Sequence, residues 1–220
     1  MLKRTWKTLL NSESQLSRLL FCSPFYPSDL STELYNELRD HPELKFTSYV
    51  IDGQNVQSPR RMMWCTNDPL CVYKFSQNHI PGLPPVKFTP NIQRVVNDVE
   101  RELSMKINAV LVNIYDSGKE HSDFHSDDDP WLGESFVVPS LSLGGEREFC
   151  VRPKQQRSDV TKISLPHASL VVMDGQFQSE YEHAVPITTD KVVLPRINLT
   201  FRYVVPELCH IDNPKQRWDS

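Results

Sequence analysis

Seven short apolar segments between residues 107 and 205 constrain the fold of this chain more than any other feature. Turn-forming dipeptides such as Gly144-Gly145 and Asp174-Gly175 separate several of them. The candidate strands are Ile107–Tyr115, Val138–Leu143, Glu148–Arg152, Thr161–Leu165, Ser169–Met173, Glu182–Pro186 and Arg196–Val205. Many short strands in one domain are typical of two sheets that close into a tapered barrel. The sequence therefore predicts an α+β, mainly β fold with a double-stranded β-helix (jelly-roll) core.

Two helices are expected to buttress this core from the N-terminal side. The first begins at Ser28 and carries leucines at four-residue spacing, from Leu30 to Leu38. The second follows Thr89-Pro90, an N-cap residue and a proline at the first helical position. Its buried stripe is expected to be Ile92, Val95, Val96, Val99 and Leu103. Residues 65–75 and the proline-rich segment 81–85 are expected to be loops or edge structure.

The composition fits one soluble globular domain. The 220 residues contain 39% hydrophobic and 24% charged side chains, as is usual for such a domain. The sequence contains no run of about 18 apolar residues, so no membrane span is expected. The basic start of the chain predicts a surface helix, with a transit peptide as the alternative. A net charge of −4 argues against a protein that coats nucleic acid, but it is compatible with an enzyme that has a local basic groove. A monomer is the default expectation.

The chain contains five cysteines, which are Cys22, Cys65, Cys71, Cys150 and Cys209. Their number is odd, and they lack the paired spacing of a zinc site. This pattern favours reduced thiols over a disulfide framework. Because reduced thiols are typical of intracellular compartments, we expect a location in the nucleus or cytoplasm.

A His-x-Asp pair, His125 and Asp127, and the distant His183 form a candidate metal-binding set. On an extended strand, residues two apart leave from the same face, so both side chains of the pair can reach one ion. His183 lies in a later strand-like segment, and a jelly-roll brings a late strand beside an early one. Two imidazoles and one carboxylate leave other metal positions free, as in non-haem Fe(II) oxygenases. These three residues are the candidate catalytic and iron-binding residues.

Each part of this set also has a plainer explanation. An isolated His-x-Asp is common by chance, and the three acids Asp127, Asp128 and Asp129 can form a solvated loop. Three adjacent carboxylates repel one another, however, unless a cation or solvent relieves them. Zinc is the less favoured metal because no cysteine accompanies the histidines.

The segment from Arg196 to Arg202 alternates polar and apolar side chains. Its polar face carries Arg196, Asn198, Thr200 and Arg202. The Cα atoms of the two arginines would lie about 20 Å apart, which leaves room for a small molecule with an anion at each end. Asn113 and Tyr115, two apart on an earlier strand, could donate hydrogen bonds to the same ligand. The alternative is a half-exposed strand with two surface arginines.

Together, these motifs resemble the AlkB family of Fe(II)/2-oxoglutarate-dependent dioxygenases. The matching motifs are Asn113-x-Tyr115, His125-x-Asp127, His183 and Arg196-x-Asn198-x-x-x-Arg202, with further likenesses at Pro59-Arg60, Tyr73-x-Phe75-Ser76 and Ser140–Gly144. The likeness is greatest for the nucleic-acid repair demethylases that include AlkB homologues two and three. It divides the chain into an N-terminal helical extension (1–44), a dioxygenase domain (45–205) with a nucleotide-recognition lid (45–80), and a C-terminal tail (206–220).

The resemblance implies a role for each matching residue. His125, Asp127 and His183 would hold Fe(II), which would bind O2 at an open position. The residues implied to bind 2-oxoglutarate are Asn113, Tyr115, Arg196, Asn198, Thr200 and Arg202. The residues implied to bind substrate are Arg60, Tyr73, Phe75 and Asp129. The base would stack between Phe75 and His125, whereas Asp129 would lie near the damaged base or simply belong to the adjoining loop. Ascorbate would act as an activator in vitro.

The resemblance also implies the reaction, which is oxidative demethylation of 1-methyladenine or 3-methylcytosine in DNA or RNA with release of formaldehyde, succinate and CO2. A cationic base suits a pocket with carboxylates. The family member that acts on duplexes carries an apolar wedge in a turn ahead of Pro-Arg. The corresponding turn here contains Asp52, which would stack poorly into a helix, so methylated single strands are the expected partner. Arg60, Arg61 and Lys74 are candidate backbone contacts, or plain surface residues.

Two other functions stay open. A related oxygenase could act on N6-methyladenine, tRNA or a protein side chain, but Tyr73 and Phe75 favour a flat base because aromatic faces stack on bases. A catalytically inactive jelly-roll could bind metal or nucleic acid, although inactivity would leave no need for a complete triad and two arginines. Turnover of 2-oxoglutarate with Fe(II) and ascorbate would separate the enzymes from the binding module.

Overall fold

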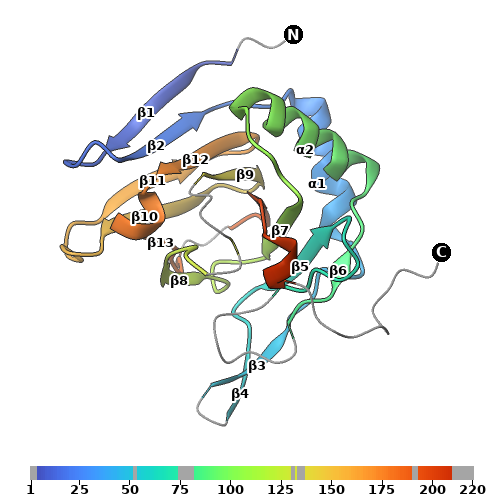
Figure 1. Cartoon of the computed structure of the whole chain (residues 1–220). Helices are drawn as coiled ribbons and strands as arrows, with labels where there is room; N and C mark the ends of the chain where they lie inside the picture. Colours follow the sequence, from blue (N-terminus) through green and yellow to red (C-terminus); the bar gives the residue numbers. More distant parts are fainter. Residues whose placement is uncertain are drawn as a thin grey trace.

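Two β-sheets pack against each other, and two helices cover the outer face of the larger sheet (Figure 1). The structure is a computed structural model, which describes residues 4–51, 54–73, 82–129, 132, 137–189 and 193–209. A separate two-stranded ribbon projects from the lower side of the body (Figure 1). This arrangement confirms the predicted mainly β jelly-roll.

The elements follow a simple layout. The larger sheet contains, in spatial order, β1 (Trp6–Asn11), β2 (Ser17–Cys22), β12 (Ser169–Gly175), β9 (Val138–Gly144), β14 (Arg196–Arg202), β7 (Ala109–Tyr115), β5 (Arg61–Thr66) and β6 (Pro85–Val86). The smaller sheet contains β11 (Thr161–Leu165), β10 (Arg147–Pro153), β13 (Tyr181–Val185) and β8 (Ser122–His125). The projecting ribbon pairs β3 (Ser48–Ile51) with β4 (Gln54–Gln57). The helices are α1 (Ser28–Arg39), α2 (Pro90–Leu103), α3 (Phe177–Glu180) and α4 (Pro206–Cys209).

Helices α1 and α2 begin where the sequence predicts. The side chain of Thr89 caps α2, since its hydroxyl accepts a hydrogen bond from the Ile92 N–H at 3.2 Å. In α1 the cap residue is Pro27, with no side-chain cap bond, and Ser28 is the first helical residue. The apolar stripes of both helices pack on the large sheet; Leu103 is only partly buried there. The two helices therefore cover one face of the large sheet, and the cavity lies on its other face.

Strand β14 lies in the middle of the large sheet, between β9 and β7. All seven of its residues are buried, so the alternative of a half-exposed strand is wrong. Ile197, Leu199 and Phe201 join the core under the helices, whereas the polar residues of the other parity line the cavity. The register sets Arg196 opposite Tyr115 and therefore brings two predicted site residues together.

Two segments differ from prediction. The expected N-terminal surface helix is wrong, because residues 6–11 form β1 and residues 17–22 form β2 at one edge of the large sheet. Within the described part of residues 1–44, α1 is therefore the only helix. Strand β5 also falls within the segment predicted as a lid, and its Met62, Trp64 and Cys65 are at most 2% exposed. Within the segment predicted as a lid, the part that stands out from the body is the β3–β4 ribbon, and a lid function stays a prediction (Figure 1).

The cysteines only partly match expectation. Cys22, Cys65 and Cys150 are buried free thiols. Cys71 is disulfide-bonded, so the prediction of reduced thiols is wrong at that position. A nuclear or cytoplasmic location stays a prediction that rests on the three free thiols.

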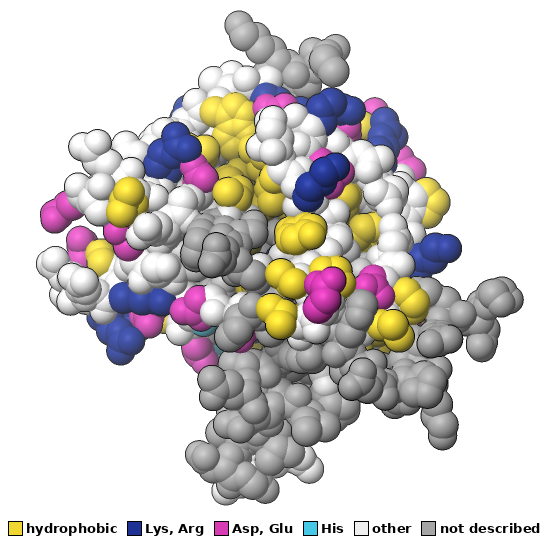
Figure 2. Space-filling model, viewed as in Figure 1, with side chains coloured by type: hydrophobic (Ala, Val, Ile, Leu, Met, Phe, Trp, Pro, Cys, Tyr) yellow, Lys and Arg dark blue, Asp and Glu magenta, His cyan; other side chains and the backbone are white. Residues whose placement is uncertain are grey.

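The surface is mixed in charge and polarity. On the face seen in Figure 2, hydrophobic side chains gather near the middle, and basic and acidic side chains alternate around them. This pattern agrees with the small net charge of −4. Among the described residues, no helix is both long and apolar enough to cross a bilayer.

His167 fastens α1 to the end of β9. Its Nδ1 accepts a hydrogen bond from the Gly144 N–H at 2.8 Å, so the neutral ring carries its proton on Nε2 and donates it to the Ser31 hydroxyl at 2.8 Å. Gly144 has φ +81°, a conformation that glycine adopts without strain. A proton on Nδ1 would face an N–H donor, and burial also lowers the pKa of His167 below its ordinary 6.5.

This contact predicts a loss of stability in mild acid. The unfolded chain binds a proton at His167 near pH 6.5, whereas the folded protein resists it, so the stabilising contribution is complete above that pH and declines as the pH falls below it. The melting temperature of the wild type should therefore fall between about pH 7.5 and pH 5, and His167→Gln should show a shallower fall. Equal slopes for the two proteins would contradict this assignment.

Candidate metal and cosubstrate site

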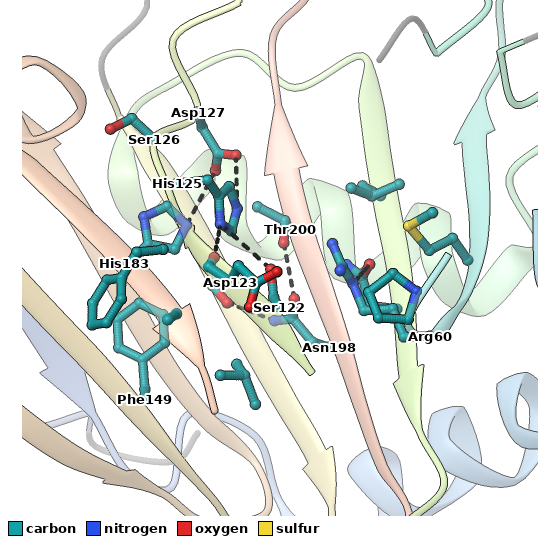
Figure 3. Close-up of a pocket in the computed structure, with 18 of the residues that line it drawn as sticks. Arg60, Ser122, Asp123, His125, Ser126, Asp127, Phe149, His183, Asn198 and Thr200 are labelled. Carbon is teal, nitrogen blue, oxygen red and sulfur yellow. Dashed lines mark hydrogen bonds and ion pairs between the residues drawn. The ribbon is translucent and has the colours of Figure 1, made fainter. Parts of the chain in front are cut away.

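The three predicted metal ligands meet at one end of the cavity (Figure 3). Strands β8 and β13 are neighbours, and their register sets His125 opposite His183. Asp127 lies two residues beyond β8, with its carboxylate oxygens 3.8 Å from His125 Nε2 and 3.9 Å from His183 Nε2. The three ligand atoms all lie within 4.8 Å of one another. The sequence prediction that these residues converge is therefore confirmed.

The hydrogen bonds of His125 leave a nitrogen lone pair free to bind a metal. Its Nδ1 lies 2.8 Å from the Asp123 carbonyl, which can only accept, so the tautomer that fits this contact has its proton on Nδ1 and the lone pair on Nε2. His183 is 6% exposed, and its Nδ1 has no hydrogen-bond partner within the described part of the chain. In both rings Nε2 is the nitrogen that faces Asp127.

The charge at Asp127 is set by Arg202. Burial acts to raise the pKa of the Asp127 carboxyl, but the positive charge of Arg202, whose Nη2 lies 2.9 Å from Oδ1, holds this pKa well below its usual range. Burial lowers the pKa of His183 to about 3, and the neighbouring His125 acts in the same direction. At neutral pH the carboxylate is therefore ionised and the His183 imidazole is neutral, which are the forms that bind metal.

Arg196 gives the clearest indication that the cavity binds an anion. The residue is 1% exposed, and its Nη2 donates a hydrogen bond to the Ser142 hydroxyl at 2.9 Å. Its Nε and Nη1 have no partner among the described residues. Burial lowers the pKa of Arg196 to about 10, so the guanidinium is still charged at neutral pH. A buried cation with two donor nitrogens that lack hydrogen-bond partners fits the carboxylate of a bound acid.

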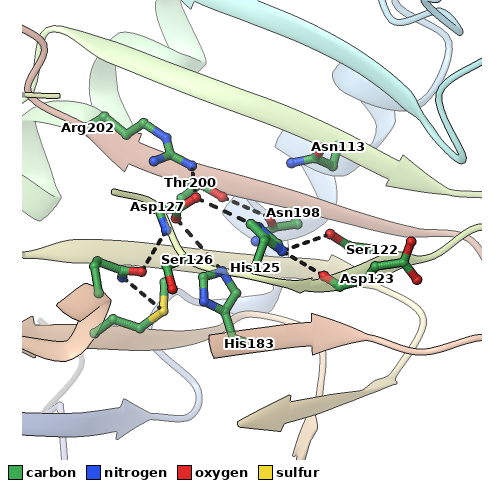
Figure 4. A network of polar contacts seen from close by, with 12 residues as sticks. Asn113, Ser122, Asp123, His125, Ser126, Asp127, His183, Asn198, Thr200 and Arg202 are labelled. Carbon is green, nitrogen blue, oxygen red and sulfur yellow. Dashed lines mark hydrogen bonds and ion pairs between the residues drawn. The ribbon is translucent and has the colours of Figure 1, made fainter. Parts of the chain in front are cut away.

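The remaining predicted cosubstrate residues line the same cavity, which has a volume of about 510 Å³. Asn198 donates a hydrogen bond to the Ser140 hydroxyl at 2.6 Å. It accepts one from the Thr200 hydroxyl at 3.0 Å (Figure 4). The ring centroid of Tyr115 lies 5.4 Å from the guanidinium carbon of Arg196. The metal ligands and the buried cation thus share one cavity, and the donor set fits an iron ion beside a keto diacid.

Only some of the predicted substrate residues lie in the described part of the chain. Tyr73 and Asp129 line the cavity, whereas Phe75 lies outside the described residues, as do Lys74 and Asp52. Burial raises the pKa of the Tyr73 phenol to about 12, so the ring is neutral. The role of each in substrate binding stays a prediction.

The two candidate arginines at the start of β5 have partners within the protein. Arg60 points into the cavity (Figure 3), where it donates to Asn113 Oδ1 at 2.8 Å and to the His121 carbonyl at 3.2 Å. Arg61 makes a two-pronged contact with Asp116, with both distances at 2.8 Å. Arg60 therefore contacts Asn113, one of the predicted cosubstrate residues, through its side chain. Contact of Arg60 or Arg61 with a nucleic-acid backbone stays a prediction.

Two buried polar residues near the site, Arg147 and Gln178, were not predicted from the sequence. Arg147 is 4% exposed and donates to the backbone carbonyls of Ser117, Glu120 and Pro186, which ties the loop between β7 and β8 to the end of β13, beside Tyr115. No clear signal in the sequence marks it, because Glu146, Glu148 and Arg152 make the surrounding segment as charged as an exposed strand. Gln178 is 1% exposed and accepts a hydrogen bond from the backbone N–H of Asp127 at 2.8 Å; its sequence context carries no signal.

A jelly-roll that brings two imidazoles, one carboxylate and a buried arginine into one cavity defines a mononuclear iron oxygenase. Comparison with protein families agrees, because residues 19–202 match the 2OG-Fe(II) oxygenase superfamily. The alpha-ketoglutarate-dependent dioxygenase alkB homolog 3 of Bos taurus is 32% identical over 205 residues, which cover 89% of this chain and 69% of that protein. The chain belongs to the AlkB family of Fe(II)/2-oxoglutarate-dependent dioxygenases.

Other relatives match over a shorter span. The human alkB homolog 3 is 33% identical over 159 residues, which are 69% of this chain and 54% of the relative. The DNA oxidative demethylase ALKBH2 of Mus musculus is 34% identical over 131 residues, or 56% of this chain and 54% of that protein. Among solved structures, "The structure of OsALKBH1" superposes with a TM-score of 0.63 over 84% of this chain and 97% of the other. Its 17% identity shows a shared fold alone.

Proposed function

We propose that this dioxygenase removes methyl groups from N-alkylated bases, such as 1-methyladenine and 3-methylcytosine, in DNA or RNA. In the balanced reaction, one N-methyl group, O2 and 2-oxoglutarate give the N–H base, formaldehyde, succinate and CO2. Bound ferrous iron would supply the oxygen chemistry. Ascorbate would help keep the iron ferrous in vitro.

The observation that carries this proposal is the shared cavity of the metal set and the buried, unpaired Arg196. His125, Asp127 and His183 would hold the metal, and Arg196 would bind one carboxylate of 2-oxoglutarate. Asn113, Tyr115, Asn198, Thr200 and Arg202 would complete the cosubstrate site. The relatives named DNA oxidative demethylase support a nucleic-acid substrate.

The substrate end of the cavity supports a cationic base. Asp128 and Asp129 line the cavity beside the metal set, and Tyr73 offers an aromatic face. Acidic oxygens near a positively charged base lower its free energy by charge complementarity. The base would stack between Phe75 and His125, Tyr73 would line the base pocket, and Arg60 would contribute to the substrate site from within the cavity.

A panel of singly methylated oligonucleotides tests the activity directly. Each oligonucleotide would be incubated with the protein, Fe(II), 2-oxoglutarate and ascorbate, and weighed by mass spectrometry. Loss of one CH2 from the 1-methyladenine or 3-methylcytosine strands, together with formaldehyde release, is the expected result. Turnover confined to N6-methyladenine, or to a protein, would replace the proposed substrate class.

The same panel should show faster turnover on single strands than on duplexes. An enzyme without an apolar wedge must wait for the base to leave the stack, which costs a few kcal/mol, so the duplex rate should be lower by about 10-fold or more. The matched control is a duplex in which the methylated base faces a mismatch, since it should recover part of the single-strand rate. Equal or faster turnover on the fully paired duplex would contradict the preference.

A further inference from the structure

We propose that Gln178 is a positioning residue of the metal centre, which fixes the backbone at Asp127 so that its carboxylate faces the two histidines. The inference rests on the proposed assignment of the metal ligands. It concerns a residue that touches no ligand atom itself, because the hydrogen bond of Gln178 to Asp127 is made with the backbone N–H and not with the carboxylate.

Asp127 needs such support because it lies beyond the end of β8, where no strand ladder fixes its backbone. Its N–H donates to Gln178 Oε1 at 2.8 Å. Gln178 is 1% exposed, so water cannot readily replace this acceptor. An unpaired buried N–H is costly, and the loop would shift to find another partner.

The amide of Gln178 is held in one orientation. Its Nε2 donates to the sulfur of Met173 at 3.5 Å, while Oε1 faces the N–H of Asp127. A flipped amide would set its NH2 group against that N–H donor and lose the bond. Met173 lies on β12 and also lines the cavity, so the chain of contacts runs from the large sheet to the metal ligand.

The helical turn that carries Gln178 is itself rigidly placed. Its Phe177 is fully buried and stacks on Tyr181 at 5.0 Å between ring centroids. The hydroxyl of Ser126 donates to the carbonyl of Tyr181 at 2.9 Å, and Tyr181 begins β13, which carries His183. Two hydrogen bonds, from Ser126 and Asp127, therefore join the loop bearing one ligand to the segment that leads into another.

The hydrogen bond from the Asp127 N–H to Gln178 acts against the electrostatic attraction between the Asp127 carboxylate and Arg202. The carboxylate already contacts Arg202 at 2.9 Å, and a metal requires the same group to keep its oxygens toward His125 and His183. A loop free to move could turn the carboxylate wholly toward the guanidinium. Partners that orient ligands in this way commonly change metal affinity by about 10–100-fold when they are removed.

The test is the affinity of the metal-free protein for Mn(II), followed by the electron paramagnetic resonance of the free ion. Gln178→Met keeps the size of the side chain but removes the acceptor, and it should raise the Kd for Mn(II) by about 10-fold or more. The matched control is Gln176→Met, the same change at an exposed residue of the same turn, and it should leave the Kd unchanged. Thermal unfolding of the metal-free proteins is measured in parallel.

The measurements distinguish a wrong role for Gln178 from a wrong assignment of the metal ligands. A Gln178→Met protein with a lowered melting temperature and an unchanged Kd would show a merely structural role and overturn the inference. If that protein does not fold, Gln178→Asn, whose amide is one methylene shorter, takes its place; a raised Kd is again expected, and an unchanged Kd would again overturn the inference. Absence of Mn(II) binding in the wild type, or unchanged binding in Asp127→Ala, would overturn the ligand assignment and the inference with it.

Discussion

Replacement of Asp127 by alanine is expected to reduce 2-oxoglutarate turnover by at least about 1,000-fold, because the metal contributes several kcal/mol of stabilisation to the reaction. The variant loses the only carboxylate of the metal set, and the two histidines alone would hold the ion weakly. Succinate formation in the presence of Fe(II) and substrate measures the loss. The matched control is Asp159→Ala, an exposed acid outside the cavity lining, which should keep its activity.

The same substitution should also weaken the fold. Arg202 is 5% exposed, and without Asp127 its charge is buried without its partner, at a cost of about 3–5 kcal/mol. Asp127→Asn keeps the volume and a hydrogen-bond acceptor for Arg202, so it should unfold at a higher temperature than Asp127→Ala while still losing turnover. An Asp127→Asn protein with wild-type turnover would mean that this carboxylate is not a metal ligand.

The sequence specified the fold best where the local pattern matched the environment of each face. Strand β14 alternates because one face packs under the helices and the other lines a polar cavity, so its period of two was visible. Strand β5 is buried on both faces, and its Met62, Met63 and Trp64 show no alternation. Strand β1 has the opposite problem, because most of its residues are exposed and only pairing with β2 makes it a strand.

The site was predictable to the extent that its chemistry is carried by residue type. His125, Asp127 and His183 stood out because that combination is uncommon by chance, and Arg196 stood out as a charge on a strand fit for a core. The partnership of Arg202 with Asp127 was not predictable, since it depends on how a loop returns to β14. Gln178 was hidden for the same reason, because only the folded chain shows that its amide meets the backbone of Asp127.

Arg196→Met should make the protein more stable without cosubstrate and yet much poorer at using it. In the wild type the buried guanidinium leaves Nε and Nη1 without partners among the described residues, and methionine fills similar volume without a charge. The gain should be about 1–3 kcal/mol, reduced by the loss of the bond to Ser142. The KM for 2-oxoglutarate should rise at least about 30-fold, because removal of one partner of a buried charge pair costs about 2–5 kcal/mol.

Thermal denaturation with and without 2-oxoglutarate measures both effects together. The cosubstrate should raise the melting temperature of the wild type by mass action and leave that of Arg196→Met nearly unchanged. Arg157→Met is the matched control, since this arginine is 65% exposed and lies on the surface, and it should bind 2-oxoglutarate normally. A stability that falls in Arg196→Met would mean that the guanidinium already has its counter-charge in the free protein. A KM equal to that of the wild type would place the carboxylate of the cosubstrate elsewhere in the cavity.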